Sequence, residues 1–285
     1  MENIETTTQL VEPTDEKKTI LGRHPFAGYL LLAYSITWIS LFPLVLDSLG
    51  YLEVSIHWHF IGALGPTLAA VIMIYFTKGK TGMQSFKNAC INWKIKINWI
   101  GIAFIAPVLF FSFALVLDYA SSGTWYDFSA FIVDNQLTTL VDVLFWALPI
   151  IAYGVFEEIG WRGFALPHLQ SRYSAIVAST ILWLVHGMWH IPMFFYRFNF
   201  DFGMVVGFFI GMYFGTILLT FIFNSSKGSV LTTVVWHTTF NAVSVMGSYS
   251  IQAFTSMAIM IVAVLILIKY GRRDLTTGTK VEDLS

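Results

Sequence analysis

The sequence predicts an all-α, polytopic membrane protein with about eight transmembrane helices and both termini in the cytosol. Hydrophobic residues make up 56% of the 285 residues and charged residues only 12%. In a soluble domain about a quarter of the residues are charged, and the mean hydropathy of +0.69 is also far too high for one. Two further observations support this class: the lengths of the apolar runs and the distribution of Lys and Arg.

Apolar runs of roughly 17–25 residues are long enough to cross about 30 Å of hydrocarbon. Runs of about this length lie near residues 26–46, 59–77, 98–117, 139–166, 174–196, 203–223, 230–247 and 251–269. We therefore expect a transmembrane domain over residues 26–270, an N-terminal cytosolic tail over residues 1–25 and a C-terminal cytosolic tail over residues 271–285.

The positive charges support both the orientation and the even number of spans, because cytoplasmic loops are enriched in Lys and Arg. With both termini inside, every Lys and Arg except Arg197 falls in a cytosolic segment, whereas an odd number of spans would scramble this partition. The cations thus follow the membrane topology. We expect a multi-pass protein of the plasma membrane, with membrane lipids and no nucleic acid among its partners.

Two carboxylates and a guanidinium occur at the end of the fourth apolar run, as Glu157, Glu158 and Arg162. A charge at the bilayer centre costs about 2.5–3.5 kcal/mol on insertion scales, so such groups are normally paired and face a protein interior or a wet cavity. On a helix Glu158 and Arg162 lie one turn apart on one face, and Glu157 points about 100° away. The spacing predicts a Glu158–Arg162 ion pair that positions the site and leaves Glu157 available for chemistry.

The fifth and seventh runs each carry two polar side chains four residues apart: His186 with His190, and His237 with Asn241. In hydrocarbon each of these groups needs a partner. A lone polar residue often makes only an interhelical hydrogen bond of about 0.6 kcal/mol. The whole set favours one small wet pocket that gathers Glu157, His190, His237 and Asn241. For His186 we favour a supporting or packing role.

The depths of these residues along straight helices agree only in part. At about 1.5 Å per residue, Glu157 lies roughly 13 Å and His237 roughly 10 Å from the cytosolic end of their runs. His190 lies roughly 24 Å from that end if its helix begins near Ser174. On this measure His186 fits the pocket better than His190, unless the helix is bent near Pro192.

Two of these patterns resemble motifs of a known family, the CAAX prenyl endopeptidase and bacteriocin-processing (CPBP) family of intramembrane proteases. Its first motif, Glu-Glu followed by three residues and Arg, is matched by Glu157, Glu158 and Arg162. Its third motif, His followed by three residues and Asn, is matched by His237 and Asn241. Each motif alone is weak evidence, but their order in separate apolar runs is specific.

The second motif of the family is matched by residues 189–192, Trp-His-Ile-Pro, which selects His190 as the site histidine. His186 departs from the pattern, since an aromatic residue usually stands at that position, and its role is left open. The resemblance covers about residues 139–247, the expected catalytic region.

The resemblance implies an intramembrane endopeptidase whose site is open to the cytosol. Hydrolysis needs an activated water and a group that stabilises the oxyanion. Glu157 with His190 can deprotonate the water, and His237 with Asn241 can bind the oxyanion. Alternatively, Glu157, His190 and His237 ligate Zn²⁺, which activates a bound water. The family includes proteins described as metalloproteases and members with a metal-free, glutamate-dependent mechanism, so both alternatives stay open.

The expected substrate is a peptide or protein, with lipidated CAAX proteins as the eukaryotic case and bacteriocin or pheromone precursors, or self-immunity, as the bacterial one. A proton-coupled transporter and a non-catalytic, peptide-binding immunity protein are the alternatives, because intramembrane Glu, His and Arg also build proton relays. The glycines at positions 203, 207, 211 and 215 recur every four residues, which suits close helix packing or a homodimer.

Overall fold

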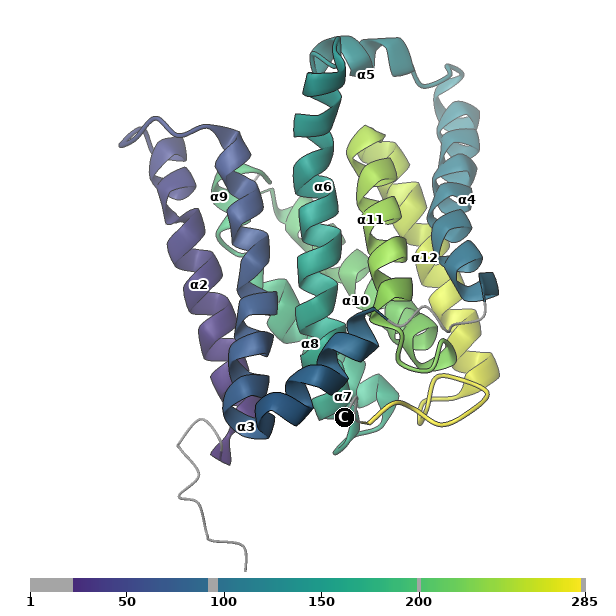
Figure 1. Ribbon diagram of the computed structural model, residues 1–285. Helices are drawn as coiled ribbons and strands as arrows, with labels where there is room; N and C mark the ends of the chain where they lie inside the picture. The colour runs from purple at the N-terminus through teal and green to yellow at the C-terminus, as the bar shows by residue number, and fades with distance from the viewer. Residues whose placement is uncertain (1–22, 92–96, 199–200, 283–285) are drawn as a thin grey trace, which may run out of the picture.

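The computed structural model describes residues 23–91, 97–198 and 201–282 (Figure 1). Within these ranges the chain forms helices and no β-strand, which confirms the predicted all-α class. Most of the predicted N-terminal tail, residues 1–22, lies outside the described residues, as do Lys94, Lys96 and residues 283–285.

The long helices occur where the apolar runs predict them, whereas the short helix Phe128–Asp134 lies between the third and fourth runs. In chain order they are α2 (Pro25–Ser48), the 3-10 helix η1 (Ile56–Ala63), α3 (Leu64–Cys90), α4 (Ile97–Ser122), α5 (Phe128–Asp134), α6 (Leu140–Gly160), the π-helical η2 (Trp161–Ala165), α7 (Leu166–Gln170), α8 (Ala175–Trp189), α9 (Met193–Tyr196), α10 (Phe202–Ser225), α11 (Val230–Met246) and α12 (Tyr249–Tyr270). In the described part of the chain, six candidate spans are long and apolar enough to cross a membrane. α8 and α11, with 15 and 17 residues, are shorter. The protein is therefore a multi-pass membrane protein, and the count of eight crossings stays a prediction.

α6 lies in the middle of the bundle and joins two groups of helices (Figure 1). On one side it packs against α3 and η1, which in turn pack against α2. On the other side it packs against α11, which contacts α4. One hydrophobic core draws on α2, α3, α6 and α8, and a second draws on α10, α11 and α12. A polar group on α6 is therefore within reach of both halves of the molecule.

The fourth run continues beyond its predicted end at residue 166. α6, η2 and α7 form one helical segment, Leu140–Gln170, of 31 residues. Its π-helical part, η2, begins directly after the turn that carries Glu157 and Glu158. A single π turn inside an α-helix is rare and is found frequently at functional sites. The change of helix type thus coincides with the charged motif.

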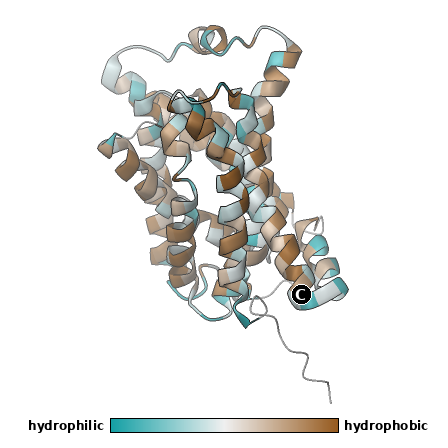
Figure 2. Cartoon of the chain, turned by 90° about the vertical axis from the view of Figure 1, so that its left-hand side faces the viewer, coloured by the Kyte–Doolittle hydropathy of each residue, from teal (hydrophilic) through white to brown (hydrophobic). Residues whose placement is uncertain are grey.

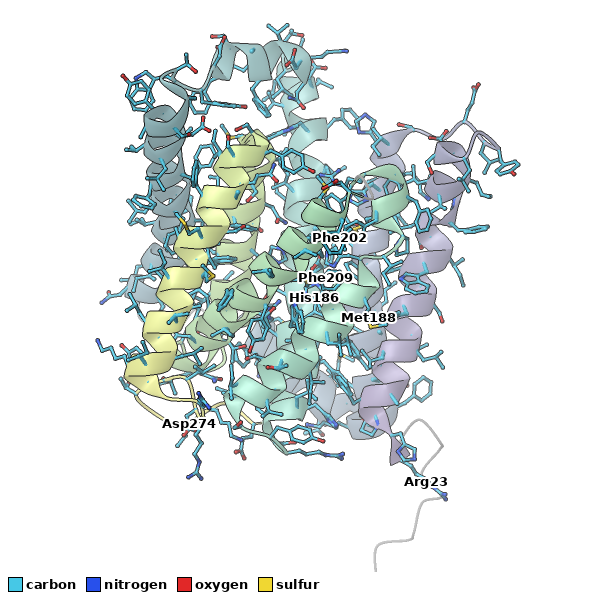
Figure 3. All side chains as sticks on the ribbon, turned by 180° about the vertical axis from the view of Figure 1, so that it is seen from behind. Arg23, His186, Met188, Phe202, Phe209 and Asp274 are labelled. Carbon is cyan, nitrogen blue, oxygen red and sulfur yellow. The ribbon has the colours of Figure 1, made fainter. Side chains whose placement is uncertain are left out.

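The two ends of the described chain lie at the same end of the bundle. Arg23 and Asp274 mark this end, and His186 lies between it and Phe202 (Figure 3). Hydrophobic colours extend along most of the length of the helices, and hydrophilic colours gather at the connections (Figure 2). Large apolar side chains such as Ile39 and Ile268 are exposed on the outside. This surface suits a hydrocarbon solvent, and the shared end of the termini accords with an even number of crossings.

Residues 271–282, within the predicted C-terminal tail, pack against the bundle. Leu275 is fully buried in the core of α10–α12. The carbonyls of Arg272 and Arg273 accept hydrogen bonds from the backbone N–H groups of Ile176 and Ala175 at 3.1 and 2.7 Å. These two N–H groups begin α8 and lack partners within the helix. The C-terminal segment therefore caps the helix that carries the two site histidines.

The glycine stripe of α10 makes one tight contact with another helix. A Cβ atom on Gly211 would lie 3.1 Å from Oγ of Ser256 on α12, whereas Gly207 and Gly215 have open space around them. The stripe thus contributes to the packing of α10 on α12 at one position, and the homodimer stays a prediction.

Candidate active site

Glu157 and Glu158 of α6 are both buried, with 2% and 0% of their surface exposed. Because consecutive helical residues point about 100° apart, the two carboxylates face different helices. Glu157 faces α8, and Glu158 faces α11 and the π-helical turn. Two acidic residues in adjacent positions thus build two different polar contacts.

Glu157 contacts the two histidines of α8. Nε2 of His186 lies 2.6 Å from Oε2 of Glu157, a short hydrogen bond. Nε2 of His190 lies 3.9 Å from Oε1, beyond hydrogen-bond distance. The structure therefore brings Glu157 and His190 together as predicted, and it adds His186 as the closer partner.

Glu158 forms the ion pair with Arg162 that the spacing predicts. Oε1 of Glu158 lies 2.7 Å from Nη1 of Arg162 and 2.7 Å from Nδ1 of His237. Arg162 belongs to the π-helical turn, and its side chain is only 1% exposed. His237 was expected beside Glu157, but its hydrogen bond goes to Glu158. The predicted site residues thus separate into a Glu157 group and a Glu158 group on the same turn of α6.

Two glycines allow α6 to approach its neighbours closely enough for these contacts. A Cβ atom on Gly154 would lie 2.8 Å from the backbone N of Thr238, next to His237 on α11. A Cβ atom on Gly160 would lie 2.5 Å from the carbonyl carbon of Pro66 on α3. Real Cβ atoms do not approach backbone atoms this closely, so any larger residue would push the helices apart. The glycines on either side of the Glu pair set the width of the site.

The His190 side chain faces Glu157, although a straight helix would place His190 too far from the cytosolic end of its apolar run. α8 begins at Ala175, close to the expected start, and ends at Trp189, so His190 follows the last helical residue. Cα–Cβ bonds tilt toward the N-terminus of a helix, and the His190 side chain accordingly lies back over the preceding turn. Its Nδ1 is 3.0 Å from the carbonyl oxygen of His186. Both histidine side chains therefore face the carboxylate of Glu157.

Asn241 is the predicted site residue that the structure does not connect to the others. Its side chain is half-buried one turn beyond His237 on α11. Among the hydrogen bonds of the described residues, none involves the Asn241 side chain. The structure thus places Asn241 one turn from His237, without a hydrogen bond to either carboxylate among the described residues.

The deep side of the site is closed by aromatic rings. The ring of Trp161 lies 4.6 Å from that of His186, and the ring of Trp189 lies 4.8 Å from that of His190. The His186 side chain is 4% exposed, whereas His190 and His237 are 12% and 14% exposed. Access to Glu157 is therefore from the side of His190 and His237.

The donor atoms of Glu157, His186 and His190 lie within 4.8 Å of one another. One carboxylate and two imidazoles are a donor set found at catalytic zinc sites. The predicted metal set, Glu157, His190 and His237, differs from this group, because Nδ1 of His237 is bound to Glu158. The signal for His186 was present in the sequence as its four-residue spacing from His190 and its better depth.

A second polar cluster lies one helical turn from Glu157, and the sequence did not indicate it. The Tyr153 hydroxyl donates to the carbonyl oxygen of His59 at 3.0 Å, and the Tyr196 hydroxyl lies 2.6 Å from Nδ1 of His59. His59 is 4% exposed. These bonds join η1, α6 and α9, so they tie the segment after His190 to the helix that carries Glu157.

The fold and the site together define the class: an all-α, multi-pass membrane protein with a buried glutamate–histidine centre between its helices. Residues 139–243 match the family described as "Type II CAAX prenyl endopeptidase Rce1-like". The chain is also similar to CAAX prenyl protease 2 of Methanococcus maripaludis, with 27% identity over 186 residues, which cover 62% of this chain and 67% of that protein. These findings confirm the resemblance to the CPBP family, and the family match supports an intramembrane endopeptidase.

Proposed function

We propose that this protein is an intramembrane endopeptidase in which Glu157 is the general base. The observation that carries the proposal is the buried Glu157 carboxylate, whose two oxygens face His186 and His190 at 2.6 and 3.9 Å. A carboxylate in a water-poor pocket with one oxygen anchored has the other oxygen free for proton transfer. General acid–base catalysis by such a group contributes typically about 10²–10⁴-fold.

The gap between Glu157 and His190 fits an attacking water. A water about 2.8 Å from both atoms would bridge Oε1 of Glu157 and Nε2 of His190 across their 3.9 Å separation. Glu157 takes a proton from this water while the water oxygen forms a bond to the carbonyl carbon of the scissile peptide. The protonated Glu157 then delivers that proton to the leaving amide nitrogen as the C–N bond breaks. The products are a carboxylic acid, which keeps the second proton of the water, and an amine; transfer of that proton to the amine gives a carboxylate and an ammonium group.

His237 and Asn241 are the groups proposed to stabilise the oxyanion. With Nδ1 held by Glu158, the Nε2 edge of His237 is directed away from that carboxylate. The carboxylates of Glu157 and Glu158 and the guanidinium of Arg162 together carry a net charge of one negative unit. An imidazolium at His237 would balance this charge. In that form Nε2 of His237 donates to the developing oxyanion, together with the Asn241 amide.

The donor set of Glu157, His186 and His190 also fits a divalent cation. If bound, a zinc ion would supply Lewis-acid polarisation and a nucleophile at neutral pH. Metal content is measured on the purified protein by elemental mass spectrometry, with and without prior chelation. Stoichiometric zinc that is lost in a His186→Ala variant would support metal dependence, and active protein without metal would support the glutamate mechanism alone.

The proposed substrate is a peptide segment at the membrane surface, and the first to test is a prenylated C-terminal CAAX peptide. This choice follows the name of the Methanococcus maripaludis relative, CAAX prenyl protease 2. A bacteriocin or pheromone precursor is the second substrate class, and an associated self-immunity role would follow from cleavage of such a peptide. We place the activity in the plasma membrane with the site open to the cytosol.

The test compares the wild-type protein with Glu157→Gln, reconstituted in lipid nanodiscs, on a farnesylated CAAX peptide. The product is identified by mass spectrometry, which also locates the cleaved bond. Glu157→Gln keeps the shape of the side chain and should lower kcat by about 10²–10⁴-fold. The matched control is Glu282→Gln, at an exposed carboxylate near the C-terminus. Cleavage by the Glu157→Gln variant at the wild-type rate would overturn the proposal.

A further inference from the structure

Two donors on α2 hold the end of α8 by a matched pair of hydrogen bonds. The Tyr34 hydroxyl donates to the carbonyl oxygen of Val185. Nε1 of Trp38 donates to the carbonyl oxygen of Trp189 at 3.0 Å. The donors are four residues apart on α2, and the acceptors are four residues apart on α8. Each acceptor immediately precedes one of the two histidines that face Glu157.

The Trp38 bond satisfies a carbonyl that has no partner within its own helix. Trp189 is the last residue of α8, and the final carbonyls of a helix lack intrahelical donors. The following turn uses other acceptors, since the N–H of Met193 bonds to the carbonyl of His190. In hydrocarbon no water is present to replace a missing donor. Trp38 therefore supplies the donor that the end of α8 itself lacks.

We propose that Tyr34 and Trp38 are positioning residues that set the height and rotation of the last turn of α8, and so aim His186 and His190 at Glu157. Their importance for catalysis rests on the proposed function, but their effect on the histidines does not. The proposal draws on α2, which lies outside the segment that matches the protease family.

The geometry at Glu157 shows why a small shift would matter. The 2.6 Å hydrogen bond from His186 would be lost if the turn moved by about 1 Å, because a contact of about 3.6 Å is no longer a hydrogen bond. The 3.9 Å gap to His190 would close or widen by the same movement. A displacement of about 1 Å remote from the chemistry can cost about 10²-fold in rate.

The test variants remove single donor atoms. Tyr34→Phe deletes only the hydroxyl, and Trp38→Phe deletes the indole N–H. The matched control is Trp58→Phe, because Nε1 of Trp58 donates to the carbonyl of Ser40 at 2.8 Å and so joins η1 to α2 rather than α2 to α8. All three variants lose one side-chain-to-backbone hydrogen bond, and only the first two touch α8.

The first readout is independent of any peptidase activity. Diethyl pyrocarbonate modifies accessible histidines, and mass spectrometry gives the rate at each position of the full-length protein in nanodiscs. In the Tyr34→Phe/Trp38→Phe double variant the rates at His186 and His190 should rise about tenfold, the effect of losing one to two hydrogen bonds. The rate at His237, on α11, should stay within twofold. Unchanged rates at His186 and His190, or an equal rise at all three histidines, would overturn the proposal.

The second readout is the division of the effect between kcat and KM on the farnesylated peptide. Misaimed histidines should lower kcat about tenfold with KM within twofold, because the loss of an interaction made only in the transition state lowers kcat and leaves ground-state binding unchanged. Trp58→Phe should change neither constant. If the wild-type protein cleaves no peptide, the proposed function is contradicted, and the modification test of the positioning role remains valid. Variants with wild-type kcat and wild-type modification rates would remove the positioning role alone.

Discussion

Nε2 of His186 lies 2.6 Å from one oxygen of Glu157, and Nε2 of His190 lies 3.9 Å from the other. Two histidines one turn apart thus address the two oxygens of one buried carboxylate, one by a direct hydrogen bond and one across a gap. In the proposed mechanism this asymmetry gives them different roles: His186 anchors Glu157, and His190 holds the water that Glu157 deprotonates.

The first prediction separates these tasks by substitution. His190→Ala should lower kcat by about 10²–10⁴-fold, because the water loses one of its two partners. His186→Gln keeps a hydrogen-bond donor for Glu157, whereas His186→Ala does not. The Gln variant should therefore retain about tenfold more activity, which corresponds to the free energy of one hydrogen bond to a charged group. Both are measured as kcat on the farnesylated peptide.

The control for these variants is His57→Ala, at an exposed position on η1, which should leave kcat unchanged. Equal activity of His186→Gln and His186→Ala would contradict an anchoring role for His186.

The second prediction concerns stability at Glu158. Removing one member of a buried ion pair leaves the other charge unpaired, which costs about 3–5 kcal/mol, whereas removing both can be nearly neutral. Glu158→Gln and Arg162→Met should therefore each lower the free energy of unfolding strongly. The double variant should be more stable than either single variant.

Thermal unfolding in detergent, followed by circular dichroism, measures this double-mutant cycle. Additive losses in the double variant would show that the 2.7 Å contact between Glu158 and Arg162 contributes no coupling.

Hydropathy predicted the positions of the long helices, because it follows from the local sequence. Helical spacing likewise predicted the Glu158–Arg162 pair. Contacts between helices were harder to predict from the sequence. His237 was expected beside Glu157 but forms its hydrogen bond with Glu158, because the rotation of α11 about its axis depends on how closely α11 approaches α6 at Gly154. The depth estimate favoured His186 over His190, because it ignored the backward tilt of side chains at the end of α8, and in the structure both histidines face Glu157.

The third prediction tests the close approach of α6 to α3. Gly160→Ala would place a Cβ atom 2.5 Å from the carbonyl carbon of Pro66. The α3 backbone cannot move away from this atom without a cost in free energy. Overpacking of this kind costs typically about 1–3 kcal/mol of unfolding free energy. Activity should fall with it, because Glu157 and Glu158 precede this contact on α6.

Gly215→Ala is the matched control, since no atom lies within 4 Å of a Cβ atom added there. It should raise the stability slightly, by up to about 1 kcal/mol, as Ala favours a helix over Gly. A Gly160→Ala variant that is as stable as Gly215→Ala would show that the two helices can separate without loss.

The fourth prediction concerns the polar cluster at His59. Tyr196→Phe removes the hydroxyl that lies 2.6 Å from Nδ1 of His59, and this buried nitrogen then shares the Tyr153 hydroxyl, at 3.2 Å, with the carbonyl oxygen of His59. The expected cost is about 1–3 kcal/mol of unfolding free energy. Tyr75→Phe, at a side chain that is 58% exposed, is the control and should be neutral. Equal stability of the two variants would indicate that His59 finds another donor.

The last prediction addresses the C-terminal segment that caps α8. Leu275 is fully buried among α10–α12, so Leu275→Ala removes apolar contacts and leaves a cavity. Such a change typically costs about 2–5 kcal/mol. Because the carbonyls of Arg272 and Arg273 cap the first turn of α8, hydrogen exchange at the amides of Ala175 and Ile176 should accelerate as well. Leu265→Ala, at a side chain that is 58% exposed toward lipid, should leave stability and amide exchange unchanged. If exchange at these two amides is equal in both leucine variants, the segment does not stabilise α8.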